Sequence, residues 1–280
     1  MKKDQLITRR KALVAGAAVL GAAGVAGTAH VLTADPAAQP VRVPPRSGPQ
    51  AARAVKPSAY RLQPITGYGP PLGAPGRTVV RHEPFLRMSG RGRTMLLTFD
   101  DGPDPLYTPD VLRILREYDV RATFFVCGEM ANDNKDLLGK MADDGHIVGN
   151  HTWTHPLLTS LSRSRIRSEI ERTSKVIKNA YGESPAWFRA PYGAWNRATF
   201  QIQADLGMEP LAWTIDTNDW ATPGVRSIVG TVEKEAAPGV VVLSHDAGGN
   251  RSQSVQALRQ YLPHLLDSGY HLTVPRRNGV

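Results

Sequence analysis

The spacing of apolar residues changes sharply along the chain. Between Asp35 and about Gly92 no regular apolar spacing is present, whereas after Arg93 short apolar runs alternate with longer stretches whose apolar residues recur every three or four positions. Short apolar runs between turn residues predict strands, and spacings of three and four predict amphipathic helices. The predicted strands are 95–99, 122–126, 147–149, 186–189, 211–215, 240–243 and 271–274.

The segments between these strands predict helices. Segment 254–267 is typical, because its apolar side chains recur at helical spacing. Strands that alternate with helices indicate a parallel α/β arrangement, and the number of strands favours a barrel over an open sheet. Reactive groups in such barrels lie where the strands end. The predicted helices are 109–118, 135–143, 163–181, 197–206, 225–236 and 254–267.

The first 34 residues are typical of an export signal. A charged start that contains the Arg9-Arg10 pair precedes an uncharged run over 12–31, and this order resembles a twin-arginine signal. The run consists mostly of Ala, Gly and Val, which suits that route better than a membrane span. We therefore expect a secreted or cell-wall-associated protein, cleaved after Ala29 or Ala34. An uncleaved N-terminal membrane anchor is the alternative.

Residues 35–92 are rich in Pro, Ala, Gly and Arg. Repeated prolines favour an extended, solvated chain, so we interpret this segment as a disordered linker. Its positive charge suits either a plain spacer or contact with an anionic wall polymer or membrane surface. The predicted organisation is a signal peptide over 1–34, a linker over 35–92 and a catalytic domain over 93–280.

Charge and composition narrow the class of protein. The 280 residues carry a net charge of +9, of which residues 1–34 contribute +4, residues 35–92 contribute +7 and residues 93–280 contribute −2. No basic patch with interleaved aromatic residues follows residue 93, so we expect no nucleic-acid partner. An apolar content of 41% suits one domain with a sizeable core. The single cysteine, Cys127, excludes an intramolecular disulfide, and we interpret it as a buried core thiol.

Two strand ends carry residues suited to a metal. Asp100 and Asp101 are adjacent carboxylates, which repel each other unless a cation or a proton separates their roles, so a metal ligand beside a general base is expected. His151 and His155 are four positions apart, as on one side of a helical turn. A metal ion held by these two histidines and Asp101 would keep coordination positions open for water and substrate. Zn²⁺ is the first choice for such a set, and Co²⁺, Ni²⁺ and Fe²⁺ are alternatives.

Three further strand ends carry groups suited to acid–base chemistry. Arg189 would hold a buried carboxylate ionised, and the turn after it would aim the Tyr192 backbone N–H at an oxyanion. His245 ends another predicted strand, and Asp216 and Asp219 are available to orient it.

The segments TFDDGP, HTWTH, RAPYG, DTNDW and LSH occur in this order. They closely resemble the five motifs of the polysaccharide deacetylases, carbohydrate esterase family four, over roughly residues 93–274. The resemblance implies a distorted (β/α) barrel of seven or eight strands. It also implies removal of acetyl groups from sugars, mostly N-acetylglucosamine in chitin or peptidoglycan, and sometimes O-acetyl groups of xylan.

The resemblance also implies a role for each residue of the motifs. Asp216 is the expected partner of His245, with Asp219 as the alternative. The implied roles are general base for Asp100, metal ligands for Asp101, His151 and His155, base positioning for Arg189, general acid for His245, and wall of the acetyl pocket for Trp220 and Leu243.

The expected protein is thus a monomeric, exported, metal-dependent deacetylase that acts on N-acetylglucosamine units of an acetylated polysaccharide or oligosaccharide. Within the same chemistry, an acetylxylan esterase is the alternative. From another class, a non-catalytic wall carbohydrate-binding protein would use the same groove without turnover.

Overall fold

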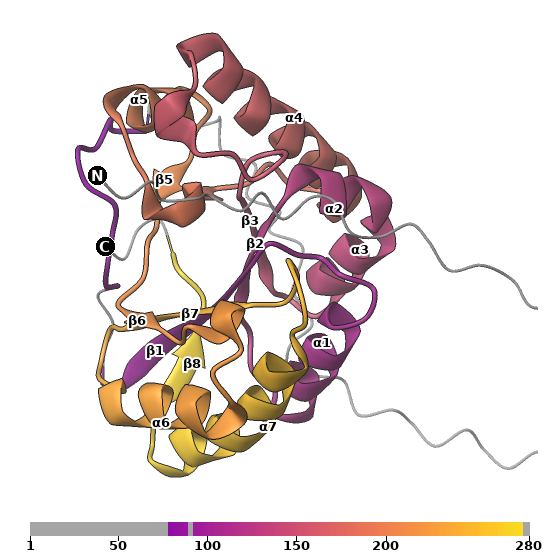
Figure 1. Cartoon of the computed structure of the whole chain (residues 1–280), viewed down its shortest axis with the longest axis vertical. Helices are drawn as coiled ribbons and strands as arrows, with labels where there is room; N and C mark the ends of the chain where they lie inside the picture. Colours follow the sequence, from indigo (N-terminus) through magenta and orange to yellow (C-terminus); the bar gives the residue numbers. More distant parts are fainter. Residues whose placement is uncertain (1–77, 89–91, 277–280) are drawn as a thin grey trace, which may run out of the picture. The chain divides into compact units, whose positions relative to one another are not determined.

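A computed structural model describes residues 78–88 and 92–276 (Figure 1). The chain divides into two units, Met1–Gly67 and Tyr68–Val280, and every described residue belongs to the second. The predicted signal over 1–34 and the predicted linker up to residue 77 lie outside the described residues. None of the helices in the described part is both long and apolar enough to span a bilayer.

The centre of the second unit is a curled sheet in which every pair of strands is parallel. The strand order is β5-β4-β3-β2-β1-β7-β6, and β8 pairs with the beginning of β1. The predicted (β/α) barrel is confirmed, although its short strands leave it distorted. The strands are β1 Thr94–Asp100, β2 Thr123–Val126, β3 Ile147–Asn150, β4 Trp187–Phe188, β5 Glu209–Pro210, β6 Ile215–Asp216, β7 Val241–His245 and β8 His271–Thr273.

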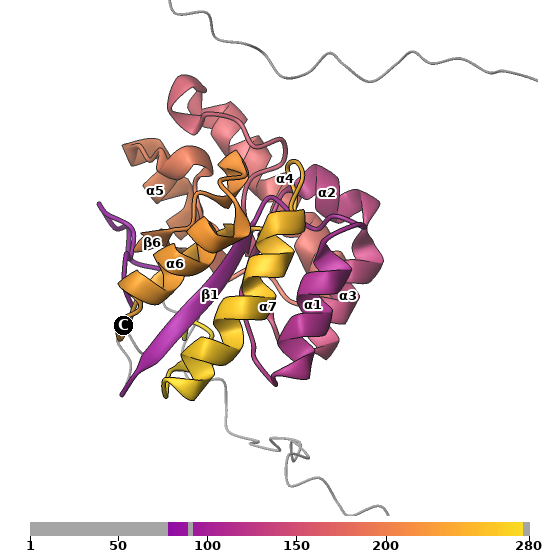
Figure 2. The same ribbon diagram turned by 60° about the horizontal axis from the view of Figure 1, so that its bottom comes forward.

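Helices connect the strands and cover the outer face of the sheet. Figure 2 shows β1 between α6 and α7, with α1 beside α7 and α3 beside α1. Three short 3₁₀ helices follow strand ends: η1 Leu158–Ser160, η2 Pro191–Gly193 and η3 Asp219–Ala221. The α-helices are α1 Thr108–Glu117, α2 Gly128–Asp133, α3 Lys135–Asp143, α4 Arg163–Tyr181, α5 Arg197–Asp205, α6 Val225–Glu235 and α7 Ser252–Asp267.

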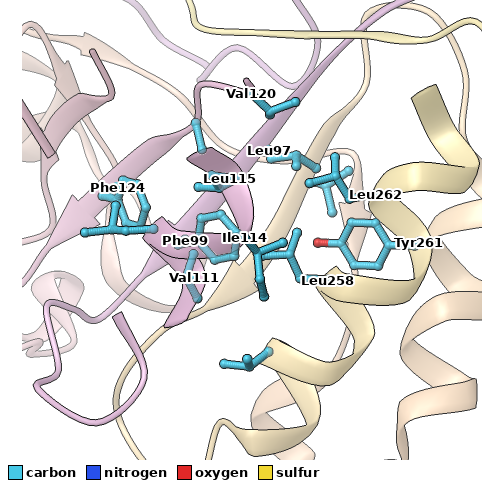
Figure 3. Packing of buried hydrophobic residues seen from close by; sticks show 14 of the residues in the cluster. Leu97, Phe99, Val111, Ile114, Leu115, Val120, Phe124, Leu258, Tyr261 and Leu262 are labelled. Carbon is cyan, nitrogen blue, oxygen red and sulfur yellow. The ribbon is translucent and has the colours of Figure 1, made fainter. Parts of the chain in front are cut away.

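The two-residue period of β1 separates the core from the site. Successive side chains of a strand point to opposite faces. Met95, Leu97 and Phe99 accordingly pack beneath the helices, in the main core that Figure 3 shows. Leu96 instead faces the interior of the barrel. Asp100 shares the parity of Leu96, which places a carboxylate at the interior mouth of the barrel.

The main core joins the strands to α1 and α7. In Figure 3, Ile114 of α1 and Leu258 of α7 lie over Phe99 of β1. Phe99 also stacks on Phe124 of β2, with ring centroids 5.2 Å apart. Each of these side chains is fully buried. This packing holds β1 rigidly, and the chain that follows it into the site starts from a fixed position.

The linker prediction is wrong for the described residues 78–88, which are part of the folded unit. Phe85 N donates to Pro210 O beside β5, and Met88 N donates to Gly239 O beside β7. Met88 is buried with only 5% of its surface exposed, and Arg81 forms an ion pair with Glu209 at 2.6 Å. This segment therefore bonds beside β5, at one end of the sheet, and beside β7, the neighbour of the other end strand.

The predicted strand over 211–215 is also wrong. The described chain has β5 ending at Pro210 and β6 beginning at Ile215. The carbonyls of Leu211 and Ala212 accept hydrogen bonds from the Arg189 side chain, at 3.1 and 2.8 Å. A buried guanidinium therefore occupies the carbonyl groups of this segment, while the N–H groups of Leu211 and Ala212 donate to Phe188 O and Phe85 O.

The region after β2 also departs from expectation, because Gly128–Asp133 forms helix α2, which is not among the predicted helices. Cys127, which precedes α2, is a free and buried thiol as predicted.

Candidate active site

The ends of neighbouring parallel strands bring the polar motif residues to one edge of the sheet. Asp100 and His245 end β1 and β7, and they are paired in the register of these two strands. His151 directly follows β3, and Arg189 directly follows β4. The parallel strands thus bring Arg189 and His245 close to Asp100, although they are 89 and 145 residues away from it in the chain.

Asp100 is held by a buried ion pair. Its Oδ1 accepts a hydrogen bond of 2.6 Å from Arg189 Nη1, and the two side chains are almost fully buried. Burial raises the pKa of Asp100 above its ordinary value, and the charge of Arg189 partly offsets this effect. A carboxylate in this setting is oriented and suited to accept a proton.

Arg189 has a partner for each of its nitrogens. Nη1 also donates to Thr98 Oγ1 at 2.8 Å, and the guanidinium carbon lies 4.1 Å from the centre of the Phe125 ring. With the bonds to Leu211 O and Ala212 O described above, the guanidinium cannot rotate without losing several hydrogen bonds. The predicted role of Arg189 as a positioning group for Asp100 agrees with this geometry.

Asp101, His151 and His155 form a cluster whose ligand atoms all lie within 4.8 Å of one another. Asp101 Oδ1 lies 3.6 Å from His151 Nε2 and 3.5 Å from His155 Nε2. Within the described part of the chain, this buried oxygen has no hydrogen-bond partner. Two imidazole nitrogens beside an otherwise unsatisfied carboxylate oxygen fit a divalent metal ion.

The protonation of His151 also suits a ligand. Burial lowers its pKa to about 3, so the ring is neutral near pH 7. Nδ1 lies 2.8 Å from Arg189 O, a carbonyl that can only accept a hydrogen bond. The proton therefore belongs on Nδ1, and the lone pair of Nε2 faces Asp101.

The two histidines meet for a different reason from the one predicted. Residues 151–155 are not helical; they form an irregular loop. Thr152 and His155 have φ values of 70° and 56°, in the left-handed region. These reversals of the backbone, and not the four-residue period of a helix, bring His151 and His155 to the same side.

A glycine on the opposite loop makes room for Asp101. A Cβ atom at Gly248 would lie 2.6 Å from Asp101 Oδ2, inside van der Waals contact. Gly248 also has a φ of 76°, which favours glycine. The loop after β7 therefore approaches the predicted ligand as closely as a residue without a side chain allows.

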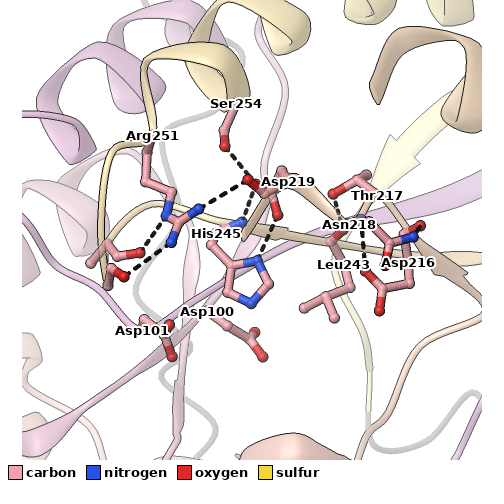
Figure 4. Close-up of polar contacts among 12 residues, drawn as sticks. Asp100, Asp101, Asp216, Thr217, Asn218, Asp219, Leu243, His245, Arg251 and Ser254 are labelled. Atoms are coloured by element: carbon pink, nitrogen blue, oxygen red, sulfur yellow. Dashed lines mark hydrogen bonds and ion pairs between the residues drawn. The ribbon is translucent and has the colours of Figure 1, made fainter. Parts of the chain in front are cut away.

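Asp219, the alternative partner, orients His245, so the preference for Asp216 is corrected. Asp219 Oδ1 lies 2.7 Å from His245 Nδ1, and Asp219 Oδ2 accepts the His245 backbone N–H at 2.9 Å (Figure 4). Asp216 Oδ1 instead accepts the backbone N–H of Asn218 at 2.8 Å, within its own turn. The left-handed φ of 52° at Asn218 turns the chain so that Asp219 faces β7.

Two residues outside the motifs complete this network. Ser254 of α7 donates to Asp219 Oδ2 at 2.6 Å, and Arg251 Nη1 donates to the carbonyl of Asp219 at 3.0 Å (Figure 4). Neither residue was predicted from the sequence. A polar residue near the start of a helix can cap that helix or contact a distant residue, and the local sequence does not distinguish the two roles.

The remaining predicted residues lie at the rim. Tyr192 has a φ of 61°, and its ring lies 4.6 Å from that of His155. The hydrogen bonds of its turn are donated by Gly193 and Ala194, so they do not use the Tyr192 N–H. Trp220 is 55% exposed in η3, whereas Leu243 is buried in β7.

Comparison with known proteins gives one consistent family. A profile of the family described as polysaccharide deacetylase matches residues 87–211. A chitooligosaccharide deacetylase of Rhizobium leguminosarum bv. trifolii is 38% identical over 207 residues, which cover 70% of this chain and 96% of that relative.

Solved structures give the same result. The peptidoglycan N-acetylglucosamine deacetylase Bc1960 is 32% identical with a TM-score of 0.65, and the match covers 67% of this chain and 88% of that one. The carbohydrate esterase family 4 pseudoenzyme BA3943 of Bacillus anthracis is 31% identical with a TM-score of 0.63, covering 68% and 66% of the two chains. A pseudoenzyme shares this fold, so the side chains of the site, and not the fold, decide whether such a chain is active.

Proposed function

Because the chain belongs to the polysaccharide deacetylase family, we propose that it is a metal-dependent hydrolase of the N-acetyl groups on N-acetylglucosamine units. Peptidoglycan and chitin-type polysaccharides or oligosaccharides are the proposed substrates, in keeping with the names of the relatives. The observation that carries the proposal is the position of Asp100. This buried carboxylate lies between Arg189 and the metal-ligand cluster, with His151 Nε2 3.6 Å from its Oδ2.

Asp101, His151 and His155 would hold the metal, and Zn²⁺ is the ion we propose for two imidazoles and one carboxylate. Co²⁺ and Ni²⁺ suit the same ligands. A divalent ion at such a site lowers the pKa of water and polarises a carbonyl group.

Asp100 would act as the general base. Its carboxylate accepts a proton from the water molecule that attacks the acetyl carbonyl carbon, which becomes tetrahedral. Arg189 keeps Asp100 oriented during this transfer, because its four side-chain hydrogen bonds fix the guanidinium. The Tyr192 N–H would donate a hydrogen bond to the oxygen that gains negative charge.

His245 would act as the general acid. Asp219 keeps its ring protonated and oriented. The ring donates its proton to the sugar nitrogen as the carbon–nitrogen bond breaks, which releases acetate and a free amine. An amine is a poor leaving group without this proton, so the step needs an acid. Trp220 and Leu243 are the residues we propose beside the acetyl methyl group.

Replacement of Asp100 tests the assignment most simply. Asp100→Asn should abolish acetate release while metal binding remains, whereas His151→Ala should lose both. Acetate release and bound metal are measured on the same preparations. Full activity in Asp100→Asn would contradict the assigned general base.

We also propose that the protein is exported, with residues 1–34 as a twin-arginine signal. The support is the order of charged and apolar residues in this segment. A double substitution of Arg9 and Arg10 by lysine should leave the protein inside the producing cell. Export at an unchanged level would contradict this part of the proposal.

A further inference from the structure

The loop that joins the two histidines of the cluster is strained. Thr152 and His155 both have left-handed φ values, which are uncommon for residues other than glycine and most costly for a β-branched side chain such as Thr. Such a conformation persists only where surrounding contacts hold it. The contacts that hold this loop therefore decide where the two imidazoles point.

Helix α4 holds one side of the loop through a single carboxylate. Glu169 Oε2 accepts the backbone N–H groups of both Trp153 and Thr154, at 2.9 and 2.8 Å. The Thr154 hydroxyl lies 3.3 Å from each carboxylate oxygen. These two N–H groups lie between His151 and His155, in the middle of the strained segment. Glu169 thus satisfies the donors that the irregular backbone leaves without a sheet or helix partner.

Helix α2 holds the other side of the same loop. The N–H of Gly128 donates to Thr152 O at 2.9 Å, and the N–H of Glu129 donates to Trp153 O at 3.2 Å. The backbone donors and acceptors between the histidines are thus bonded on opposite sides. Without Glu169, the N–H groups of Trp153 and Thr154 would lose their acceptor, and the loop would lose its backbone hydrogen bonds to α4.

The Trp153 ring adds a second contact between the loop and α4. The guanidinium carbon of Arg172 lies 4.0 Å from the ring centre, and Arg172 follows Glu169 by three positions, on the same face of the helix. A Cβ atom at Gly128 would overlap the ring, so the ring packs tightly between α2 and α4. One turn of α4 therefore contacts both the backbone and the side chain of the loop.

We propose that Glu169 is a positioning residue that sets the affinity of the site for its divalent metal. This inference rests on the proposed function, because it needs Asp101, His151 and His155 to bind the ion. Glu169 contacts the backbone between two of these ligands and does not belong to the ligand cluster itself. It acts by fixing the angle between the two imidazoles.

The test compares substitutions at Glu169 with a matched control on the same helix. Glu171 is a control because it has the same charge but is exposed and pairs with Arg167 at 3.1 Å. Full-length wild type, Glu169→Ala, Glu169→Gln and Glu171→Gln are titrated with Zn²⁺ in competition with a chromogenic chelator. The thermal unfolding of each metal-free protein is measured in parallel.

We expect Glu169→Ala to raise the Zn²⁺ dissociation constant about 10- to 100-fold, the usual cost of losing a group that supports a metal ligand. Glu169→Gln should lie between Ala and wild type, because its amide oxygen keeps the reach but loses the charge. Glu171→Gln should match wild type. If Glu169→Ala does not fold, the Gln variant alone decides, since it has the shape of the native side chain.

Unchanged affinity in Glu169→Ala and Glu169→Gln would overturn the inference, even if both unfold at lower temperature, because Glu169 would then only stabilise the fold. Equal loss in Glu169→Gln and Glu169→Ala would also overturn it, because charge and not position would be acting. Failure of the wild type to bind Zn²⁺ would instead overturn the metal site of the proposed function, and this inference with it.

Discussion

His245 Nδ1 lies 2.7 Å from Asp219 Oδ1, at the buried end of β7. The other oxygen of this carboxylate accepts the His245 backbone N–H at 2.9 Å and the Ser254 hydroxyl at 2.6 Å. One side chain therefore fixes the ring and the backbone of the proposed acid. Asp219 can hold a protonated imidazole in place through the reaction.

Asp219 and Asp216 give a matched pair of substitutions in one turn. Asp219→Asn should lower kcat for deacetylation about 100-fold or more, in the range typical of a general acid. Asp216→Asn should have little effect, because its carboxylate bonds only within its own turn in the described structure. Steady-state rates of acetate release measure both. Equal losses in the two variants would contradict the pairing of His245 with Asp219.

The pH dependence follows from the same pair. Burial lowers the pKa of His245, but the hydrogen bond and the charge of Asp219 outweigh burial and raise the pKa to about 9. Only the protonated ring can donate, so kcat should fall as the pH rises through this pKa. The charges of Asp100 and Asp101 also raise the pKa of His245, and a cation bound at Asp101 would offset this effect. The fall in kcat should therefore occur at or below about pH 9.

Removal of the Asp219 charge tests this assignment. In Asp219→Asn the residual activity should fall at a lower pH than in wild type, because burial then lowers the pKa of His245 without the opposing charge of Asp219. Profiles of kcat against pH for the two proteins give the shift. An alkaline fall at the same pH in both would show that a different group titrates.

The close approach of Gly248 to Asp101 predicts a defect in metal binding. Gly248→Ala places a methyl group 2.6 Å from the present position of Asp101 Oδ2, so the carboxylate has to move and the metal should bind more weakly. Gly269→Ala is the control: its φ of 77° nearly equals the 76° of Gly248, but a Cβ there meets no atom within 4 Å.

Both Gly248→Ala and Gly269→Ala should lower thermal stability through backbone strain, by about 1 kcal/mol. Only Gly248→Ala should also weaken metal binding and acetate release. Isothermal titration with Zn²⁺ and thermal unfolding separate the two effects. A similar metal affinity in both variants would mean that the site adjusts to the added methyl group.

Local patterns were sufficient for most of the fold. Helices α3 and α4 begin and end where the spacing of apolar residues predicts, and α4 has both a capping serine, Ser162, and a left-handed terminal glycine, Gly182. The failures involve distant contacts. The carbonyls of Leu211 and Ala212 accept hydrogen bonds from the Arg189 side chain, and no pattern within their own segment indicates this.

The site residues also fall into those that local sequence patterns predict and those that depend on distant contacts. Asp100, His151, Arg189 and His245 could be found because parallel strands bring their ends to one edge. The choice between Asp216 and Asp219 could not, since it depends on the left-handed φ at Asn218. Glu169 gave no signal either, because a glutamate in a charged helix is ordinarily an exposed residue.

The packing of residues 78–88 indicates that the folded domain begins before residue 93, where the sequence analysis places its start. A chain that begins at residue 93 loses the Arg81–Glu209 ion pair and the buried Met88. The Met88 side chain alone contributes about 2 kcal/mol by burial. We expect a chain that begins at residue 78 to resist urea better than one that begins at residue 93. Equal unfolding midpoints would show that the segment does not stabilise the domain.

Acetate release from defined substrates is the decisive measurement for the proposed deacetylase activity. Purified protein is supplied with Zn²⁺ and incubated with chitooligosaccharide, peptidoglycan and acetylxylan, with a chelator-treated sample and Asp100→Asn as controls. The proposed function predicts acetate and a free sugar amine from chitooligosaccharide or peptidoglycan, and loss of both products in the two controls. Release from acetylxylan alone, or no release from any substrate with metal present, would contradict it.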